Sequence, residues 1–119
     1  AYLKAWAMGA EAAKIDREAV AAMCRKSIPE EWESEEGGQA LLDASMKMIL
    51  PHTPKHGQPQ PDVWQAIQAP YMKYGIIEAE LDPATFIDNS FYEDANTFDT
   101  AEIQAAIEEW KAANPDYLK

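Results

Sequence analysis

Cysteine, basic charge and long apolar runs are all scarce in this chain of 119 residues. Cys24 is the only cysteine, so no disulfide can form within the chain and no cluster of cysteines can hold a metal. No apolar run approaches the roughly 20 residues of a membrane-spanning helix. The one pair of adjacent glycines, Gly37 and Gly38, lies among glutamates that would repel a phosphate. Within these residues the absences argue against a disulfide scaffold, a transmembrane helix and a glycine-rich phosphate loop.

Acidic side chains outnumber basic ones by 21 to 10, which gives a net charge of −11. The excess is concentrated in residues 78–119, which hold 11 acidic and 2 basic side chains, whereas residues 1–77 hold 10 and 8. Because an acidic surface repels a phosphate backbone, we expect no nucleic-acid partner. The ordinary role of such a charge is solubility.

The pattern of caps and prolines predicts an all-α chain of five or six short helices in a single helical region, residues 1–119. Capping residues precede apolar residues at helical spacing, and prolines mark the junctions. No run is long enough to predict a strand. The expected helices cover residues 1–13, Asp16 (cap) to 26 or 27, Ser34 (cap) to the residue before Pro51, 61–74, a short turn from Asp82 (cap), and Thr100 (cap) to 113. Residues 115–119 are expected to fray.

The most informative stretch is residues 61–92. Pro61 suits the first position of a helix, where its missing N–H would be unpaired anyway. Gly75 is a natural left-handed stop. One helical face carries a stripe of four residues, which Trp64 widens from beside it: Val63, Ile67, Tyr71 and Tyr74. Pro70 interrupts the pattern, so we expect two short helical pieces that meet one residue before it.

This stretch resembles part of a known family. A Trp one turn into a short helix is followed by an aromatic-x-x-aromatic-Gly-Ile-Ile ending, then by LDP at 81–83 and FIDNSF at 86–91. These motifs resemble the C-terminal part of the periplasmic substrate-binding proteins of ABC importers, in the nitrate, sulfonate, taurine and thiamine-precursor class. The opening AYLKAWAMGA is similar to the helix with which that family returns to its first lobe, and the resemblance covers residues 1–95.

The resemblance implies a parent protein with a two-lobed α/β fold that captures a small molecule and delivers it to a membrane permease. This segment would pack on the first lobe and the hinge, and most ligand contacts would come from residues outside it. The implied location is periplasmic. No signal peptide is visible and the first residues already read as helix, so we expect a fragment of a longer precursor. A fragment would expose apolar surface and self-associate.

A second hypothesis is a free-standing acidic helical module for protein interaction or self-association. It is supported by the charge of the last third and by four tryptophans, of which Trp32 has no obvious helical face. A free-standing module should fold cooperatively, whereas a fragment should aggregate or dimerise.

Few residues are candidates for chemistry. Trp64, Tyr71 and Tyr74 are the aromatic candidates for a ligand contact, with core packing as the alternative interpretation. His52 and His56 have the spacing of zinc ligands on a helix, but the intervening prolines predict a mobile surface loop and no metal site.

The aromatic and polar residues 85–92 either line a small-molecule pocket or pin the chain to a core through two phenylalanines, and we favour pinning. Nucleophile–histidine and paired-carboxylate arrangements are not evident, so no enzyme activity and no cofactor are predicted.

Overall fold

The computed structural model describes residues 1–118, and over these residues it is 69% helix with six α-helices and no strand. The prediction of an all-α chain of five or six helices is confirmed. The α-helices are α1 (Tyr2–Ile15), α2 (Arg17–Ser27), α3 (Glu35–Ile49), α4 (Pro61–Lys73), α5 (Tyr92–Ala95) and α6 (Thr100–Ala113). Three short 3₁₀-helices accompany them: η1 (Pro29–Trp32) between α2 and α3, η2 (Pro83–Thr85) between α4 and α5, and η3 (Pro115–Tyr117) after α6.

Most helix starts follow the predicted caps. The side chains of Asp16 and Ser34 accept hydrogen bonds from the backbone N–H three residues on, at 2.9 and 3.0 Å. The last helix differs, because Asp99 rather than Thr100 accepts from the first turn. A carboxylate is favoured over a hydroxyl there because its negative charge also lies at the positive end of the helix dipole.

α4 is one continuous helix, so the predicted break before Pro70 is wrong. Pro70 lies in the last turn, where its missing N–H removes a single bond, and the helix ends at Lys73 soon after it. Gly75 follows with φ +70°, as predicted for a left-handed stop. The N–H groups of Gly75 and Ile76 donate to the carbonyls of Met72 and Tyr71 at 3.0 and 2.8 Å, which is the Schellman pattern.

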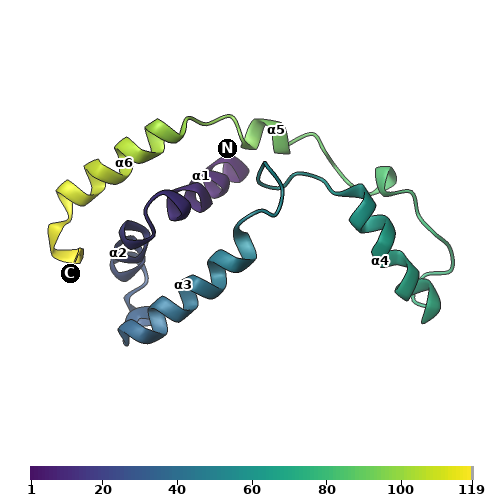
Figure 1. Ribbon diagram of the computed structural model, residues 1–119, viewed down its shortest axis with the longest axis horizontal. Helices are drawn as coiled ribbons and strands as arrows, with labels where there is room; N and C mark the ends of the chain where they lie inside the picture. The colour runs from purple at the N-terminus through teal and green to yellow at the C-terminus, as the bar shows by residue number, and fades with distance from the viewer. Residues whose placement is uncertain (119) are drawn as a thin grey trace.

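α1 lies at the centre of a helical body and contacts α2, α3, α5 and α6 (Figure 1). The buried faces are made mainly of alanine: Ala7, Ala10, Ala13, Ala19, Ala21, Ala22 and Ala95. Ile103 and Ile107 of α6 are the larger buried apolar side chains of this body. Alanine lets helices approach closely but buries little apolar area, so this core is thin. Leu3 and Trp6 of α1 are exposed.

Trp32 has a defined place that the sequence did not indicate. Its ring lies against Gly38, where an added Cβ would come within 2.3 Å of the indole. The guanidinium carbon of Arg25 lies over the Trp32 ring, 4.8 Å from its centroid. Gly38 is therefore needed so that α3 can lie close to η1.

Arg25 also pairs with Glu35 across the junction of α2 and α3. Two guanidinium nitrogens donate to the carboxylate at 2.9 and 2.5 Å, and these bonds, with one from Gln39, lower the pKa of Glu35 to about 2. Because the folded pKa lies below the usual value, this pair stabilises the fold above pH ~4.3 and is lost as the pH falls towards 2.

We expect Arg25→Ala to raise the pKa of Glu35 well above 2, although Gln39 still holds it below the usual value. A carboxyl NMR titration of Glu35 measures this shift. Lys26→Ala is the control, because Lys26 pairs with Asn114 and should leave the Glu35 titration unchanged. A Glu35 pKa that stayed near 2 in Arg25→Ala would contradict the assignment.

The end of the chain is more ordered than predicted. Residues 115–117 form η3 against α2, with the Lys26 ammonium 5.7 Å from the ring centroid of Tyr117. The prediction of a frayed tail is wrong for these residues because cations of α2 hold them. Residue 119, included in that prediction, lies outside the described residues.

Asp16 connects three helices. It directly follows α1 and caps α2, and its other carboxylate oxygen accepts from Lys111 of α6 at 3.1 Å. The bond from the Ala19 N–H lowers the pKa of Asp16, burial opposes this, and Lys111 lowers it further. Its contribution is therefore present above pH ~3.9 and is lost as the pH falls through the lowered pKa.

We expect Asp16→Ala to lower the free energy of unfolding by about 1–2 kcal/mol, measured by urea denaturation at pH 7. Asp16→Asn keeps the cap and loses only the charge, so it should cost less. It should also weaken the acid dependence of stability. Equal losses in the two variants would contradict a capping role.

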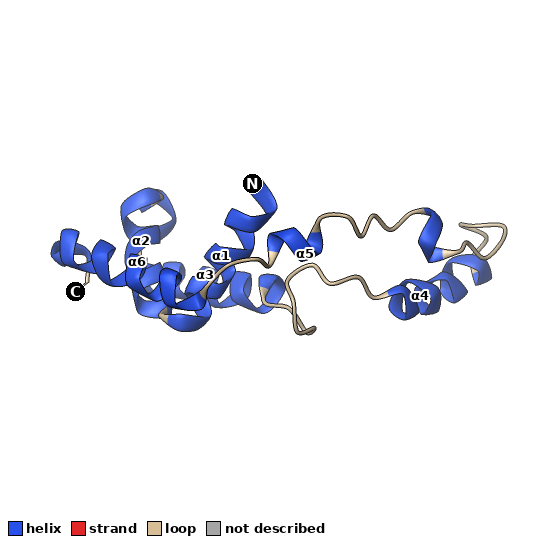
Figure 2. Ribbon diagram, turned by 90° about the horizontal axis from the view of Figure 1, so that it is seen from above, coloured by secondary structure: helices blue, strands red, loops and turns tan. Residues whose placement is uncertain are grey.

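The chain as a whole is open. Its Cα radius of gyration is 18.5 Å, whereas a compact domain of this length has about 13.5 Å. α4 and η2 stand away from the helical body. One irregular segment leads from the body to α4, and another leads back from η2 to α5 (Figures 1 and 2). The surface area is 8291 Å², about 1,800 Å² more than expected for a compact protein of this mass.

Candidate docking surface

The part that stands away, which we call the α4 lobe, comprises residues 61–87. It contains α4, the turn that follows it and η2, which packs back on α4. Large apolar side chains of this lobe are exposed: Val63, Trp64, Ile67, Tyr71, Met72, Tyr74, Ile76, Leu81 and Phe86. Monomeric proteins rarely expose so many large apolar side chains on one small element.

Gln68 holds the α4 lobe together. Its side-chain amide donates to the Leu81 carbonyl at 2.8 Å and accepts from the Leu81 N–H at 2.6 Å. Only 6% of Gln68 is exposed, and it is the one polar residue on the apolar face of α4. A second polar contact joins Gln65 to Glu80. These bonds fix residues 76–82, which we call the returning segment, against the helix.

A hollow of about 210 Å³ lies between α4 and the returning segment. Its walls are apolar or aromatic apart from Gln68: Trp64, Ile67, Gln68, Tyr71, Ile77, Leu81 and Phe86. Trp64 and Phe86 meet edge to face, with ring centroids 5.9 Å apart. The two rings keep their relative orientation while leaving the hollow open to solvent.

Two of the three aromatic ligand candidates lie in this hollow. Trp64 and Tyr71 line it, each 47% exposed, whereas Tyr74 is 74% exposed and lies beside Lys73. Neither Trp64 nor Tyr71 is packed in a core of the described chain. The sequence indicated these two rings through their helical spacing.

The sequence analysis did not predict that the hollow would be lined by Gln68, Ile77 and Leu81. Gln68 carried a usable signal, because it is a polar residue one turn after Trp64 on an otherwise apolar face. The two residues of the returning segment carried none, because its path depends on the bonds to Gln68.

We expect Gln68→Ala to release the returning segment from α4, since both backbone groups of Leu81 lose their partner. Amide exchange at Leu81 should become faster by about tenfold or more. Gln58→Ala, in the loop outside the lobe, is a matched control that should change nothing there. Unchanged protection of Leu81 in Gln68→Ala would contradict the bonding described.

The histidine loop differs from its prediction as a mobile surface segment. His56 is only 5% exposed, and its Nε2 lies 3.1 Å from the carboxylate of Glu11. Its backbone N–H and C=O pair with the side chain of Asn96, each at 2.9 Å. The ring packs against Trp6 and Phe98. These contacts tie the loop to α1 and α5.

The contact between Glu11 and His56 fixes the position of one proton on the His56 ring. Burial acts to raise the pKa of Glu11, but hydrogen bonds from Lys14 and His56 outweigh it and the pKa is lowered. An ionised Glu11 only accepts, so Nε2 of His56 donates. Nδ1 is buried and finds no hydrogen-bond partner among residues 1–118.

The predicted pinning role fits the two phenylalanines only in part. Phe86 closes one end of the hollow in the α4 lobe. Phe91 is 58% exposed and lines a second hollow, of about 230 Å³, beside Trp6 and His56. Neither ring is buried by the described residues, so each leaves apolar surface uncovered.

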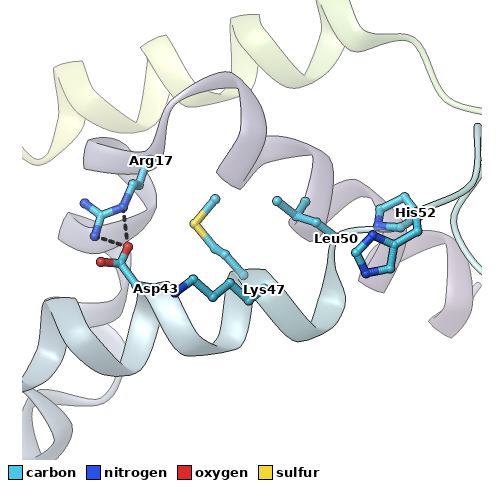
Figure 3. A pocket seen from close by; sticks show the side chains of 7 residues that line it. Arg17, Asp43, Lys47, Leu50 and His52 are labelled. Atoms are coloured by element: carbon cyan, nitrogen blue, oxygen red, sulfur yellow. Dashed lines mark hydrogen bonds and ion pairs between the residues drawn. The ribbon is translucent and has the colours of Figure 1, made fainter.

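A third hollow, of about 470 Å³, lies between the start of α2 and the end of α3 (Figure 3). Arg17 and Asp43 close one end through an ion pair of 2.6 Å, and Leu50 and His52 lie at the other (Figure 3). The guanidinium already pairs with Asp43 and Glu18, and Lys47 of α3 lines the hollow as well.

Reactive centres are not prominent. Burial, with the nearby charge of Glu31, raises the pKa of the Cys24 thiol, so it stays protonated at neutral pH. Across residues 1–118, no group of three or more potential metal ligands is found. No helix in that range has the length and apolar content needed to span a membrane.

Comparisons with protein-family models, with curated proteins and with solved structures found no match. The functional interpretation therefore depends on the residues and their geometry.

Proposed function

We propose that this chain is the C-terminal helical part of the solute-binding component of a bacterial ABC importer, working in the periplasm. The parent protein captures a small molecule and delivers it to a membrane permease. In this role the chain packs on the first lobe and the hinge, and residues outside it supply most ligand contacts.

The observation that carries the proposal is the open shape with its uncovered apolar face. The excess surface of about 1,800 Å² is more than twice the ~800 Å² that one partner contributes to a standard interface. Packing over that extent is typical of a segment inside a larger fold. Gly75, which ends α4, and Asp82, which caps η2, both belong to the motifs on which the resemblance depends.

The ligand would act by closing two lobes, since contact with both shifts the population towards the closed state. In this proposal the chain packs on the first lobe and the hinge, and so it supports the hinge while the lobes close. Trp64 and Tyr71 are the residues of this chain that we propose for any direct contact with the ligand. Tyr74 lies outside the hollow they line.

A free-standing acidic interaction module is the second candidate. The exposed face of the α4 lobe favours it, because a binding surface is also an uncovered apolar face. On this proposal the same residues dock on a separate protein and no importer is involved.

Reading the coding sequence upstream of the Ala1 codon separates the two. The importer proposal requires a signal peptide followed by about 200 residues of alternating strands and helices, enough for the remaining α/β structure. A start codon directly before Ala1 would contradict it, and the interaction module would replace it.

A further inference from the structure

We infer that the hollow of the α4 lobe binds one large apolar side chain of a partner segment, and that a basic side chain of the same segment lies in the acidic depression beside it. This inference depends on the geometry of the lobe and not on importer membership.

The hollow excludes a polar occupant. Apart from the Trp64 indole N–H and the Tyr71 hydroxyl, Gln68 is its only polar wall, and both ends of the Gln68 amide already bond to Leu81. A polar group placed there would lose its water without gaining a partner, which costs free energy. The occupant at this point is therefore apolar.

The size of the hollow limits the occupant to one side chain. Its volume is about 210 Å³, and a cavity of about 150 Å³ already accepts benzene. A single Trp, Phe or Leu side chain fits, stacking on the rings of Trp64 and Phe86. A whole helix face does not.

A second depression, of about 350 Å³, lies on the same two elements one step along α4. Asp62 of α4 and Asp82 of the returning segment line it together with Gln65, the neighbour of Trp64. Two carboxylates with amide groups beside them suit a guanidinium or ammonium group. The apolar and acidic sites thus lie side by side.

Charge selects against a second copy of this chain as the occupant. The α4 lobe carries four acidic residues, Asp62, Glu78, Glu80 and Asp82, against the single Lys73, which leaves a net charge of −3. Two such lobes face to face would repel each other. A segment with an apolar anchor and basic neighbours is complementary on both counts.

The test uses the whole chain and three labelled helical peptides. The first carries a Trp anchor with Arg one turn away, the second has Glu in place of Arg, and the third has Ala in place of Trp. Fluorescence anisotropy should show the first binding at least about tenfold more tightly than either twin, and more weakly as salt increases.

Two matched variants locate the binding. Ile67→Lys places a cation in the hollow and should abolish binding of the first peptide. Asp62→Asn with Asp82→Asn should weaken it about fivefold or more, whereas Glu102→Gln with Glu109→Gln makes the same charge change on α6 and should not.

Equal affinity for the Arg and Glu peptides, or binding that survives Ile67→Lys, would overturn the inference. Concentration-dependent dimers that Ile67→Lys dissolves would also overturn it, since the occupant would then be a second copy. Each of these results leaves the upstream coding sequence as an independent test of the importer proposal.

Discussion

Replacing Ile107 by alanine is expected to lower the free energy of unfolding by about 2–5 kcal/mol. Ile107 is 2% exposed and packs with Ile103 and Ala19 at the contact of α6 with α1 and α2. Partly buried side chains complete the cluster: Met8, Ala12, Ile15, Met23 and Phe98. Because the other buried residues are nearly all alanine, few large side chains can move in to fill the space.

Urea denaturation followed by far-UV circular dichroism measures this loss. Glu109→Ala, an exposed position on the same helix, is the control and should change stability by less than about 0.5 kcal/mol. A loss below about 1 kcal/mol in Ile107→Ala would mean that α6 does not pack as described.

Asn96→Ala is expected to cost about 2–3 kcal/mol. The Asn96 side chain accepts from the His56 N–H, donates to the His56 carbonyl, and donates to the Tyr92 carbonyl at 2.6 Å. Truncation leaves partly buried backbone groups of the histidine loop unpaired. Removing a partner from such groups costs more than the bond itself is worth.

Amide exchange at His56 together with urea denaturation measures both the local and the global effect of Asn96→Ala. Asn89→Ala is the matched control, because Asn89 is exposed. Exchange at His56 should accelerate only in Asn96→Ala. If both variants behaved like the original chain, the loop would be held by the histidine ring alone.

The helices could be predicted from the sequence because their ends are set locally. Asp16, Ser34 and Asp82 each bond to a backbone N–H two or three residues away, and Gly75 stops α4 by its own conformation. Such signals need no knowledge of the rest of the fold. The break expected at Pro70 did not occur because a proline costs little within the last turn of a helix. Pro70 lies in that turn, since α4 ends at Lys73.

The buried loop and the site could not be predicted in full because they depend on contacts between distant residues. His56 is buried by Glu11 and Asn96, which lie 45 and 40 residues away along the chain. Trp64 and Tyr71 could be identified by their spacing on one helix. Leu81 joins them only through Gln68, and no periodicity connects those two residues.

The α4 lobe stands away from the helical body and leaves its apolar face uncovered, and this open arrangement can be measured in solution. Small-angle X-ray scattering of the monomeric fraction tests it most directly, with forward scattering confirming the monomer mass. An open chain should give a radius of gyration near or slightly above 18.5 Å. A monomer near the ~13.5 Å of a compact domain would show that the lobe folds back on the body, and would contradict the claim.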